Sequence, residues 1–204
     1  MTELAESCGR QLSGATQTAL RAAIEGIGMG VVVVCGFPAS GKTTAARFLA
    51  EQLDTIIFDK DGFAPKLEES VMAELTGNPH DRDSAMYRRV VGPYIYDALI
   101  ANALMVGQRN VVVVDAPFLE FVGSALQSNV TLSEYLRSKV GFPVDVRTVW
   151  MSVDPKEIRE RMIKRGAERD LPKLADWSAY RSEILDSGLR VEAEKVVDSF
   201  IVNE

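Results

Sequence analysis

The chain of 204 residues is long enough for one domain with a sizeable core, and its 47% hydrophobic and 25% charged residues are ordinary for a globular protein. A net charge of −6 disfavours nonspecific binding to nucleic acid, and no apolar run reaches the ~18 residues that cross a bilayer. The N-terminus lacks the apolar region of a secretory signal, and Cys8 and Cys35 stand far apart, so we expect a cytoplasmic protein with no membrane partner.

Strands and helices are predicted to alternate after a helical extension at residues 1–28. The valine runs at 31–34 and 111–114 are apolar throughout, as in strands covered on both faces. The expected strands are 31–35, 55–59, 111–115, 146–153 and 195–202, and the expected helices are 42–53, 64–75, 84–107, 131–140 and 155–166. Pro93 is expected to kink the longest helix. This alternation predicts a three-layer, doubly wound α/β fold with a mostly parallel five-stranded sheet and ligands at the carboxyl ends of its strands.

A glycine-rich loop follows the first expected strand. Residues 36–43 read G-F-P-A-S-G-K-T and satisfy G-x-x-x-x-G-K-[ST], a pattern in which backbone N–H groups and the start of a helix surround an anion. Lys42 is expected to reach the β- and γ-phosphates of ATP, and Thr43 to bind Mg²⁺, with Thr44 the weaker metal ligand. The predicted nucleotide-binding residues are Gly36, Pro38, Ala39, Ser40, Gly41, Lys42, Thr43 and Thr44.

Acidic residues follow the second and third expected strands. Asp115 fits the carboxylate that holds the metal, and Ala116 stands where many motor-type ATPases have a water-activating glutamate, which argues against simple hydrolysis. Asp61 is the preferred general base for an acceptor hydroxyl, and Asp59 is a second acceptor-binding or metal-side group. Which of the two is the base stays open, and the structural alternative is an Asx-type turn with Gly62.

Basic residues near the C-terminal third could neutralise phosphate charge. Arg161 and Arg165 are spaced i, i+4 on one expected helix, and Arg169 follows soon after a glycine. A mobile segment that carries arginines can close over a triphosphate. The alternative is a solvated helix with an ion pair between Glu157 and Arg161, which leaves the repulsion between Arg161 and Arg165 unexplained.

A polar loop between two expected helices contains the only histidine. His80 and Arg82, with Asp81 and Asp83 beside them, would face the acceptor side of the cleft, and Arg88 follows on the next helix. These residues are predicted to bind a polar substrate, although a lone histidine in such a loop is more often just exposed. Metal binding by the loop is not expected, since no cysteine or second histidine accompanies it.

Together these motifs resemble the P-loop kinases, and within them the branch of chloramphenicol phosphotransferase, zeta-type toxin kinases and the polynucleotide 5′-hydroxyl kinase domain. The resemblance covers about residues 30–202 and rests on GFPASGKTT, on DKD after the second strand, on VVVVDAPF and on RMIKRGAERD. It implies that Asp61 is the general base and that Arg161, Arg165 and Arg169 belong to a lid. The implied parts are a P-loop kinase-like domain at 29–204, a helical acceptor-side insertion at 62–110 and a lid at 156–176. The chain also resembles bacterial ATP-binding proteins of the AAA type.

The expected activity is transfer of the γ-phosphoryl group of ATP to a hydroxyl of a small molecule, with Mg²⁺ bound. One alternative is a nucleotide-binding regulator or slow NTPase. Another is a nucleic-acid 5′-hydroxyl kinase, which would need a basic track that the net charge of −6 disfavours. The sequence indicates neither the identity of the acceptor nor the oligomeric state.

Overall fold

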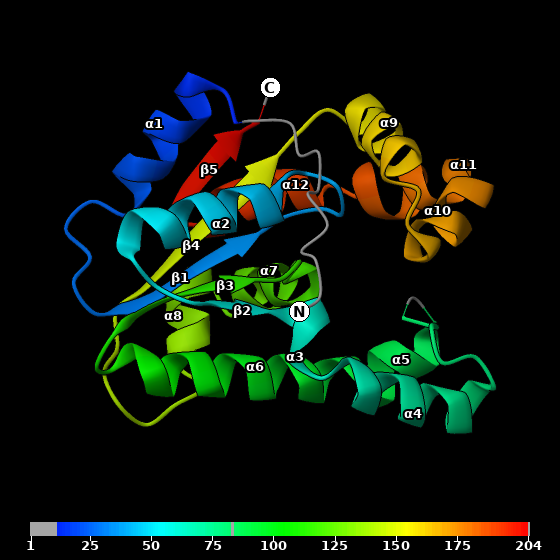
Figure 1. Cartoon of the computed structure of the whole chain (residues 1–204), viewed down its shortest axis with the longest axis horizontal. Coiled ribbons are helices and arrows are strands. Elements are labelled where there is room, and N and C mark those ends of the chain that lie inside the picture. Colours follow the sequence, from blue (N-terminus) through cyan, green and yellow to red (C-terminus); the bar gives the residue numbers. More distant parts are fainter. Residues whose placement is uncertain (1–11, 83, 204) are drawn as a thin grey trace, which may run out of the picture.

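The computed structural model describes residues 12–82 and 84–203, so Cys8, Asp83 and residues 1–11 of the expected extension lie outside this description, as does the side chain of Arg169. Its central sheet has five parallel strands in the order β2-β3-β1-β4-β5 (Figure 1). The strands are β1 (Gly30–Cys35), β2 (Ile57–Asp59), β3 (Val111–Asp115), β4 (Val146–Ser152) and β5 (Ser199–Val202). The predicted α/β fold class is confirmed, with a sheet that is parallel throughout.

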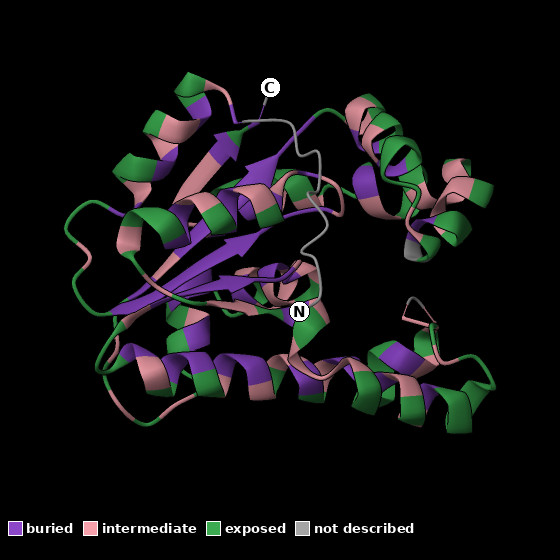
Figure 2. Ribbon diagram, in the orientation of Figure 1, coloured by how far each residue is buried: buried purple, intermediate pink, exposed green. Residues whose placement is uncertain are grey.

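Helices cover both faces of this sheet and make three layers, with the buried strands in the middle (Figure 2). Val32 and Val34 of β1 face one core, whereas Val31 and Val33 face the other, because successive side chains of a strand point to opposite faces. Both cores exclude water, which explains why the run is apolar throughout. The first core contains α1 (Gly14–Ala23) and α2 (Lys42–Leu53), and the second contains α6 (Gly92–Gly107), α7 (Leu119–Gln127), α8 (Leu132–Arg137) and α12 (Leu189–Val196).

The remaining helices lie beyond the carboxyl ends of the strands, in two separate groups (Figure 1). The first group is α3 (Lys60–Phe63), α4 (Pro65–Thr76) and α5 (Ala85–Val90). The second group is α9 (Pro155–Arg165), η1 (Glu168–Asp170), α10 (Leu171–Ala175), α11 (Trp177–Tyr180) and η2 (Arg181–Leu185). None of the helices within the described residues is long and apolar enough to span a bilayer.

Secondary structure departs from the prediction in several places, among them the short helices α3, α10 and α11, which were not predicted, and the following three. The helix expected at 84–107 divides at Val91, because Pro93 lies in the first turn of α6 and cannot donate the hydrogen bond that would continue α5. The strand expected at 195–202 begins only at Ser199, since the residues before it end α12. Helices α7 and α12 lie outside the predicted helices, and neither has the side-chain N-cap that marks a helix start in a sequence.

Cys35 is a core residue, as predicted. It lies fully buried in β1, and its thiol donates a hydrogen bond to the carbonyl oxygen of Val149 at 3.4 Å. Burial raises the pKa of Cys35 to about 12, although the Lys42 ammonium nearby opposes the shift. The thiol is therefore protonated and unreactive at neutral pH.

Candidate functional site

The loop between β1 and α2 is shaped by glycines at Gly36 and Gly41, whose φ angles are +135° and +97°. A Cβ at Gly36 would collide with the carbonyl oxygen of Met151, and a Cβ at Gly41 would collide with the side-chain amide of Asn203. Only glycine fits both positions, so the chain can curl tightly over the N-terminus of α2. This is the backbone shape that binds phosphate at the positive end of a helix dipole.

Asn203 ties the end of β5 to this loop. Its side-chain amide donates a hydrogen bond to the carbonyl oxygen of Ser40 at 2.9 Å, and its backbone N–H donates to the carbonyl of Ser152 at 2.7 Å. The guanidinium of Arg161 in turn donates to the carbonyl of Asn203 at 3.3 Å. No motif marks Asn203 in the sequence, because its position depends on the register of β5 beside β4.

Lys42 is the first residue of α2 and is only 9% exposed. Its ammonium closes the loop by donating a hydrogen bond to the carbonyl oxygen of Phe37 at 2.8 Å. Burial lowers the pKa of Lys42, while the carboxylates of Asp115 and Asp61 oppose that shift. A buried ammonium held by a neutral carbonyl would gain from an anionic partner, as a phosphate oxygen would be.

Thr43 and Asp115 meet where β3 ends. The hydroxyl of Thr43 donates to a carboxylate oxygen of Asp115 at 2.6 Å, and Asp59 lies beside Asp115 in the register of β2 and β3. Burial raises the pKa of Asp115, opposed by the Lys42 ammonium and by the hydrogen bond from Thr43. Hydroxyl and carboxylate oxygens are the ligands that Mg²⁺ prefers, so this donor set fits the cation.

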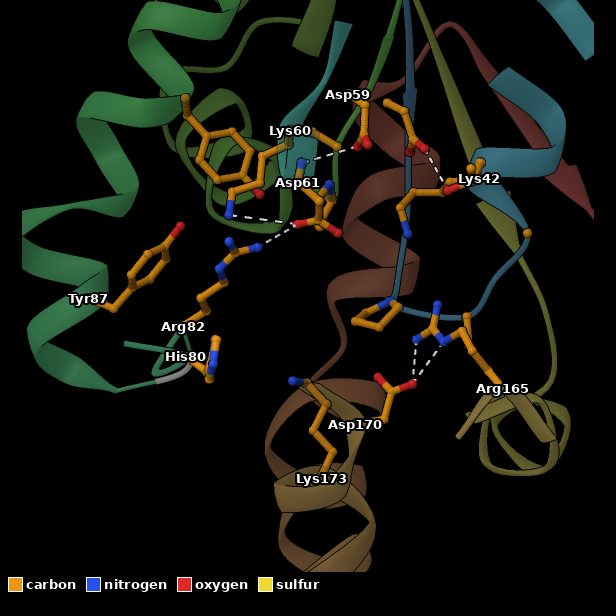
Figure 3. Close-up of a pocket in the computed structure, with 18 residues that line it drawn as sticks. Lys42, Asp59, Lys60, Asp61, His80, Arg82, Tyr87, Arg165, Asp170 and Lys173 are labelled. Carbon is orange, nitrogen blue, oxygen red and sulfur yellow. Dashed lines mark hydrogen bonds and ion pairs between the residues drawn. The ribbon is translucent and has the colours of Figure 1, made fainter. Parts of the chain in front are cut away.

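A cleft of about 220 Å³ joins the loop to the acidic residues (Figure 3). The predicted site residues that line it are Pro38, Ala39, Gly41, Lys42, Thr43, Asp59, Asp61, His80, Arg82, Asp115 and Arg165. It is also lined by residues that the sequence did not single out, namely Lys60, Tyr87, Tyr96, Asp170 and Lys173. The structure therefore gathers residues from both predicted halves of the site around one space.

Other predicted residues lie elsewhere. Gly36, Ser40 and Thr44 do not line the cleft, although Gly36 and the fully buried Ser40 shape the loop. Arg88 lines a larger cavity next to the cleft instead. Arg161 does not line the cleft either, and Arg169 lies in η1 with its side chain outside the described part of the structure.

The wall across the cleft from Lys42 is organised by a buried carboxylate, Glu68. Its Oε2 atom accepts hydrogen bonds from Lys60 at 3.1 Å and the Tyr87 hydroxyl at 3.2 Å, and lies 3.0 Å from Nε of Arg82. Arg82 and Lys60 also reach Oδ1 of Asp61, at 3.3 and 3.9 Å (Figure 3). We call these five residues the Glu68 cluster. Two cations are thus shared between a buried carboxylate and a carboxylate that faces the cleft.

Glu68 was missed by the sequence reasoning, and it is fully buried. Its other carboxylate oxygen, Oε1, is also buried and has no hydrogen-bond partner among the described residues. A weak signal was present, since Glu68 precedes the buried Met72 by one helical turn and so lies on the apolar stripe of α4. A carboxylate on such a stripe indicates a buried cationic partner, but not which one.

Among the predicted lid arginines whose side chains are described, Arg165 lines the cleft and Arg161 does not. Two of its nitrogens donate to one carboxylate oxygen of Asp170, at 2.9 and 2.6 Å, and Asp170 is only 1% exposed (Figure 3). Arg161 is paired with Glu157 at 2.7 Å, as the solvated-helix alternative proposed. Each arginine therefore has its own carboxylate partner, and these partners offset the repulsion between Arg161 and Arg165 without a ligand.

Residues 31–184, which make up more than half of the chain, match the AAA domain family. The chain belongs to this AAA domain family. Membership of an AAA domain with this phosphate loop implies nucleotide binding, and it confirms the resemblance to ATP-binding proteins of the AAA type. A search of curated proteins found no match to this chain.

Solved structures with the same fold are distant in sequence. Shikimate kinase from Bacteroides thetaiotaomicron has a TM-score of 0.50 at 18% identity, over 86% of each chain. A chain of the PezAT toxin–antitoxin system of Streptococcus pneumoniae has a TM-score of 0.52 at 15% identity, over 92% of this chain and 74% of that one. Deoxyadenosine kinase from M. mycoides has a TM-score of 0.50 at 15% identity, over 85% and 90%. These similarities confirm the kinase-like fold of the AAA domain.

Proposed function

We propose that this AAA domain transfers the γ-phosphoryl group of ATP to a hydroxyl of a small molecule. The observation that supports this most is that Lys42 and Asp61 line the same cleft from opposite walls (Figure 3). A phosphate loop alone would suit a nucleotide-binding regulator or a slow NTPase. The Glu68 cluster adds an ordered, charged wall at the place where an acceptor hydroxyl would have to lie. Two proteins of the same fold, shikimate kinase and deoxyadenosine kinase, are kinases, which agrees with the proposal.

On the nucleotide side, the loop at 36–43 would bind the phosphates through its backbone, and Lys42 would neutralise charge on the β- and γ-phosphates. Thr43 and Asp115 would hold Mg²⁺, which supplies further neutralisation of the triphosphate when it is bound. Asp59 lies beside Asp115 in the sheet register and belongs to this metal side. Catalysis in this scheme is positioning and charge neutralisation.

On the acceptor side, Asp61 would accept the proton of the attacking hydroxyl. The geometry favours Asp61 over Asp59, because one carboxylate oxygen of Asp59 accepts the backbone N–H of Asp61 and caps α3. His80 and Arg82 line the same cleft and would contact the acceptor. Residues 62–110 would then be the acceptor-side insertion.

The lid would be the segment at 156–176. Arg165 already faces the cleft, and Gly166, with φ of +61°, ends α9 directly after it. When ATP is bound, the guanidinium could exchange part of its contact with Asp170 for the triphosphate. Arg169 is a second lid residue in this proposal, and Arg161 contributes through Asn203 rather than by direct contact.

The test is a screen for ATP-dependent addition of one phosphate to hydroxyl compounds, read by mass spectrometry, with the wild-type chain and Asp61→Asn side by side. We expect Asp61→Asn to keep its ATP affinity and to lose transfer by about 100-fold or more. Asp145→Asn, an exposed change away from the cleft, is the control and should behave as wild type. ATP turnover that occurs only as hydrolysis, whatever hydroxyl compound is added, would contradict the proposal and favour a slow NTPase.

A further inference from the structure

A second cavity, of about 850 Å³, opens beside the cleft. Arg82, Tyr87, Tyr96 and Lys173 line both spaces, so a molecule in the larger one could extend a hydroxyl towards Asp61. We call this larger space the chamber. Its volume is that of sites which bind drug-sized ligands, and it is several times what a small polyol would need.

One wall of the chamber is a continuous group of aromatic rings. The ring of Tyr96 packs against Phe118 and Phe121 with centroid distances of 5.2 and 5.4 Å, and Phe121 packs against Tyr135 at 6.1 Å. These rings come from α6, α8 and the start of α7, which are fixed on the sheet. A rigid aromatic wall favours a ligand with an apolar or aromatic body.

The chamber also carries an excess of negative charge. Glu120, Glu183 and Glu192 line it from α7, η2 and α12. Among the described residues, none of these three carboxylates has an ion pair or a side-chain hydrogen bond. An unbalanced carboxylate beside an apolar wall favours a cationic ligand group.

Within the described part of the chain, four cations line the chamber, namely Arg82, Arg88, Lys139 and Lys173, against five carboxylates, which are Asp97, Asp176 and the three glutamates, so one negative charge stays in excess. Lys139 is paired with Asp97 at 3.3 Å, and its ammonium lies 5.6 and 5.3 Å from the ring centroids of Phe121 and Tyr135. Arg82 belongs to the Glu68 cluster, and Lys173 lines the cleft as well. The position of Lys139 also demonstrates that the aromatic wall accepts an ammonium group.

From these observations we infer that the acceptor is a hydroxyl compound with an apolar or aromatic body and a positively charged amine. The hydroxyl would lie at Asp61, the body against the aromatic wall and the amine near the three carboxylates. That the ligand accepts a phosphoryl group rests on the proposed function, but the binding preference of the chamber does not depend on turnover. It excludes a polyanionic acceptor such as a nucleic-acid end, which the carboxylates would repel.

The inference is tested with three matched probes that share a biphenyl body and a hydroxymethyl group at one end. The other end carries an aminomethyl, a methyl or a carboxyl group. Binding is measured by titration calorimetry without ATP. We expect the amine to bind about tenfold more tightly than the methyl compound, and the carboxylate to bind most weakly.

Substitutions of the three carboxylates test whether they cause the preference for the amine. The triple change Glu120→Gln, Glu183→Gln and Glu192→Gln should make the three probes bind about equally, while Glu194→Gln, exposed on the same helix as Glu192 and outside the chamber, should leave the order unchanged. Equal binding of the probes to the wild-type chain, tighter binding of the carboxylate, or no binding of any probe at millimolar concentration would overturn the inference.

The two proposals fail in different ways. If the amine binds best but no hydroxyl compound ever gains a phosphate from ATP, the kinase proposal fails and the ligand preference of the chamber stands. If phosphate is transferred to hydroxyl compounds but the probes bind without regard to charge, the kinase proposal stands and the acceptor class is wrong.

Discussion

The two walls of the cleft are built in different ways. The phosphate loop takes its shape from consecutive residues, with Gly36 and Gly41 in conformations that exclude a side chain and Lys42 beside them. The Glu68 cluster instead brings side chains from α3, α4, α5 and the loop before α5 into one network of charges. We therefore expect the first, a backbone structure, to tolerate change outside the loop, whereas the second depends on one buried carboxylate.

The largest effect is expected from Lys42→Ala. The substitution removes the ammonium that closes the loop and would face the phosphates, so ATP affinity should fall by at least about 100-fold, because a buried charged contact is worth several kcal/mol. Affinity is measured by titration with a fluorescent ATP analogue.

The control is Lys66→Ala, which removes an exposed lysine whose ion pair within the described residues is with Glu69 on α4. It should leave ATP affinity unchanged. ATP binding by Lys42→Ala at wild-type strength would remove the assignment of the phosphate loop.

The second prediction concerns Glu68→Gln. Loss of this buried charge leaves Lys60 and Arg82 with only the more exposed Asp61 as a shared partner, so the free energy of unfolding should fall by about 3 kcal/mol. Asp61 then loses its fixed cations, and phosphoryl transfer should fall about 10- to 100-fold while ATP affinity stays within a factor of two or so. Denaturant unfolding and transfer assays measure the two effects.

The pH dependence of stability gives a second test of Glu68→Gln. Burial lowers the pKa of Lys60, and the Glu68 carboxylate opposes that shift, so Glu68→Gln should lower it further. Below the ordinary lysine pKa of about 10.4, the folded variant then binds fewer protons than the folded wild type, so its stability deficit should shrink as pH rises towards that value. Glu74→Gln, exposed on the same helix, is the control. A stability deficit that does not change with pH would show that the Glu68 carboxylate does not influence the pKa of Lys60.

The same contrast explains what the sequence could reveal. The phosphate loop, the carboxylate of Asp115 at the end of β3 and the all-apolar strands follow from short consecutive patterns, and the fold follows from their alternation. Glu68 and Asn203 act through partners brought close by tertiary packing, so a local pattern gives at most the weak signal of a carboxylate on the apolar stripe of α4, and it names none of the partners. Spacing predicts that Arg161 belongs to the lid, but packing directs its guanidinium to Glu157, and Arg88 lines the chamber rather than the cleft.

A smaller effect is expected from Asp115→Asn on the chain without ligands. Burial raises the pKa of Asp115 in the folded state. Between the unfolded pKa of about 3.9 and this raised pKa, the folded state keeps a proton that the unfolded state has released. Ionisation of Asp115 therefore lowers the stability of the folded state as pH rises through this range. The variant should unfold about 2–4 °C higher at pH 7, and its advantage should grow as pH rises from about 4 through the raised pKa and then stay constant. Thermal unfolding from pH 4 to 8 measures this. An equal midpoint at every pH would contradict the desolvation of Asp115, and retention of wild-type Mg²⁺ dependence would contradict its metal role.

The smallest effect is expected from Asn203→Ala, which tests how far the phosphate loop depends on more than its own residues. The substitution removes the hydrogen bond to Ser40 and opens space above Gly41, but it leaves the glycine conformations and Lys42 in place. A loop that is shaped by its backbone should lose only about three- to tenfold in ATP affinity, the cost of one neutral hydrogen bond. Asn102→Ala, on the exposed face of α6, is the matched control. A loss as large as that of Lys42→Ala would mean that β5 holds the loop in shape, and the contrast between a self-sufficient loop and a tertiary Glu68 cluster would then be wrong.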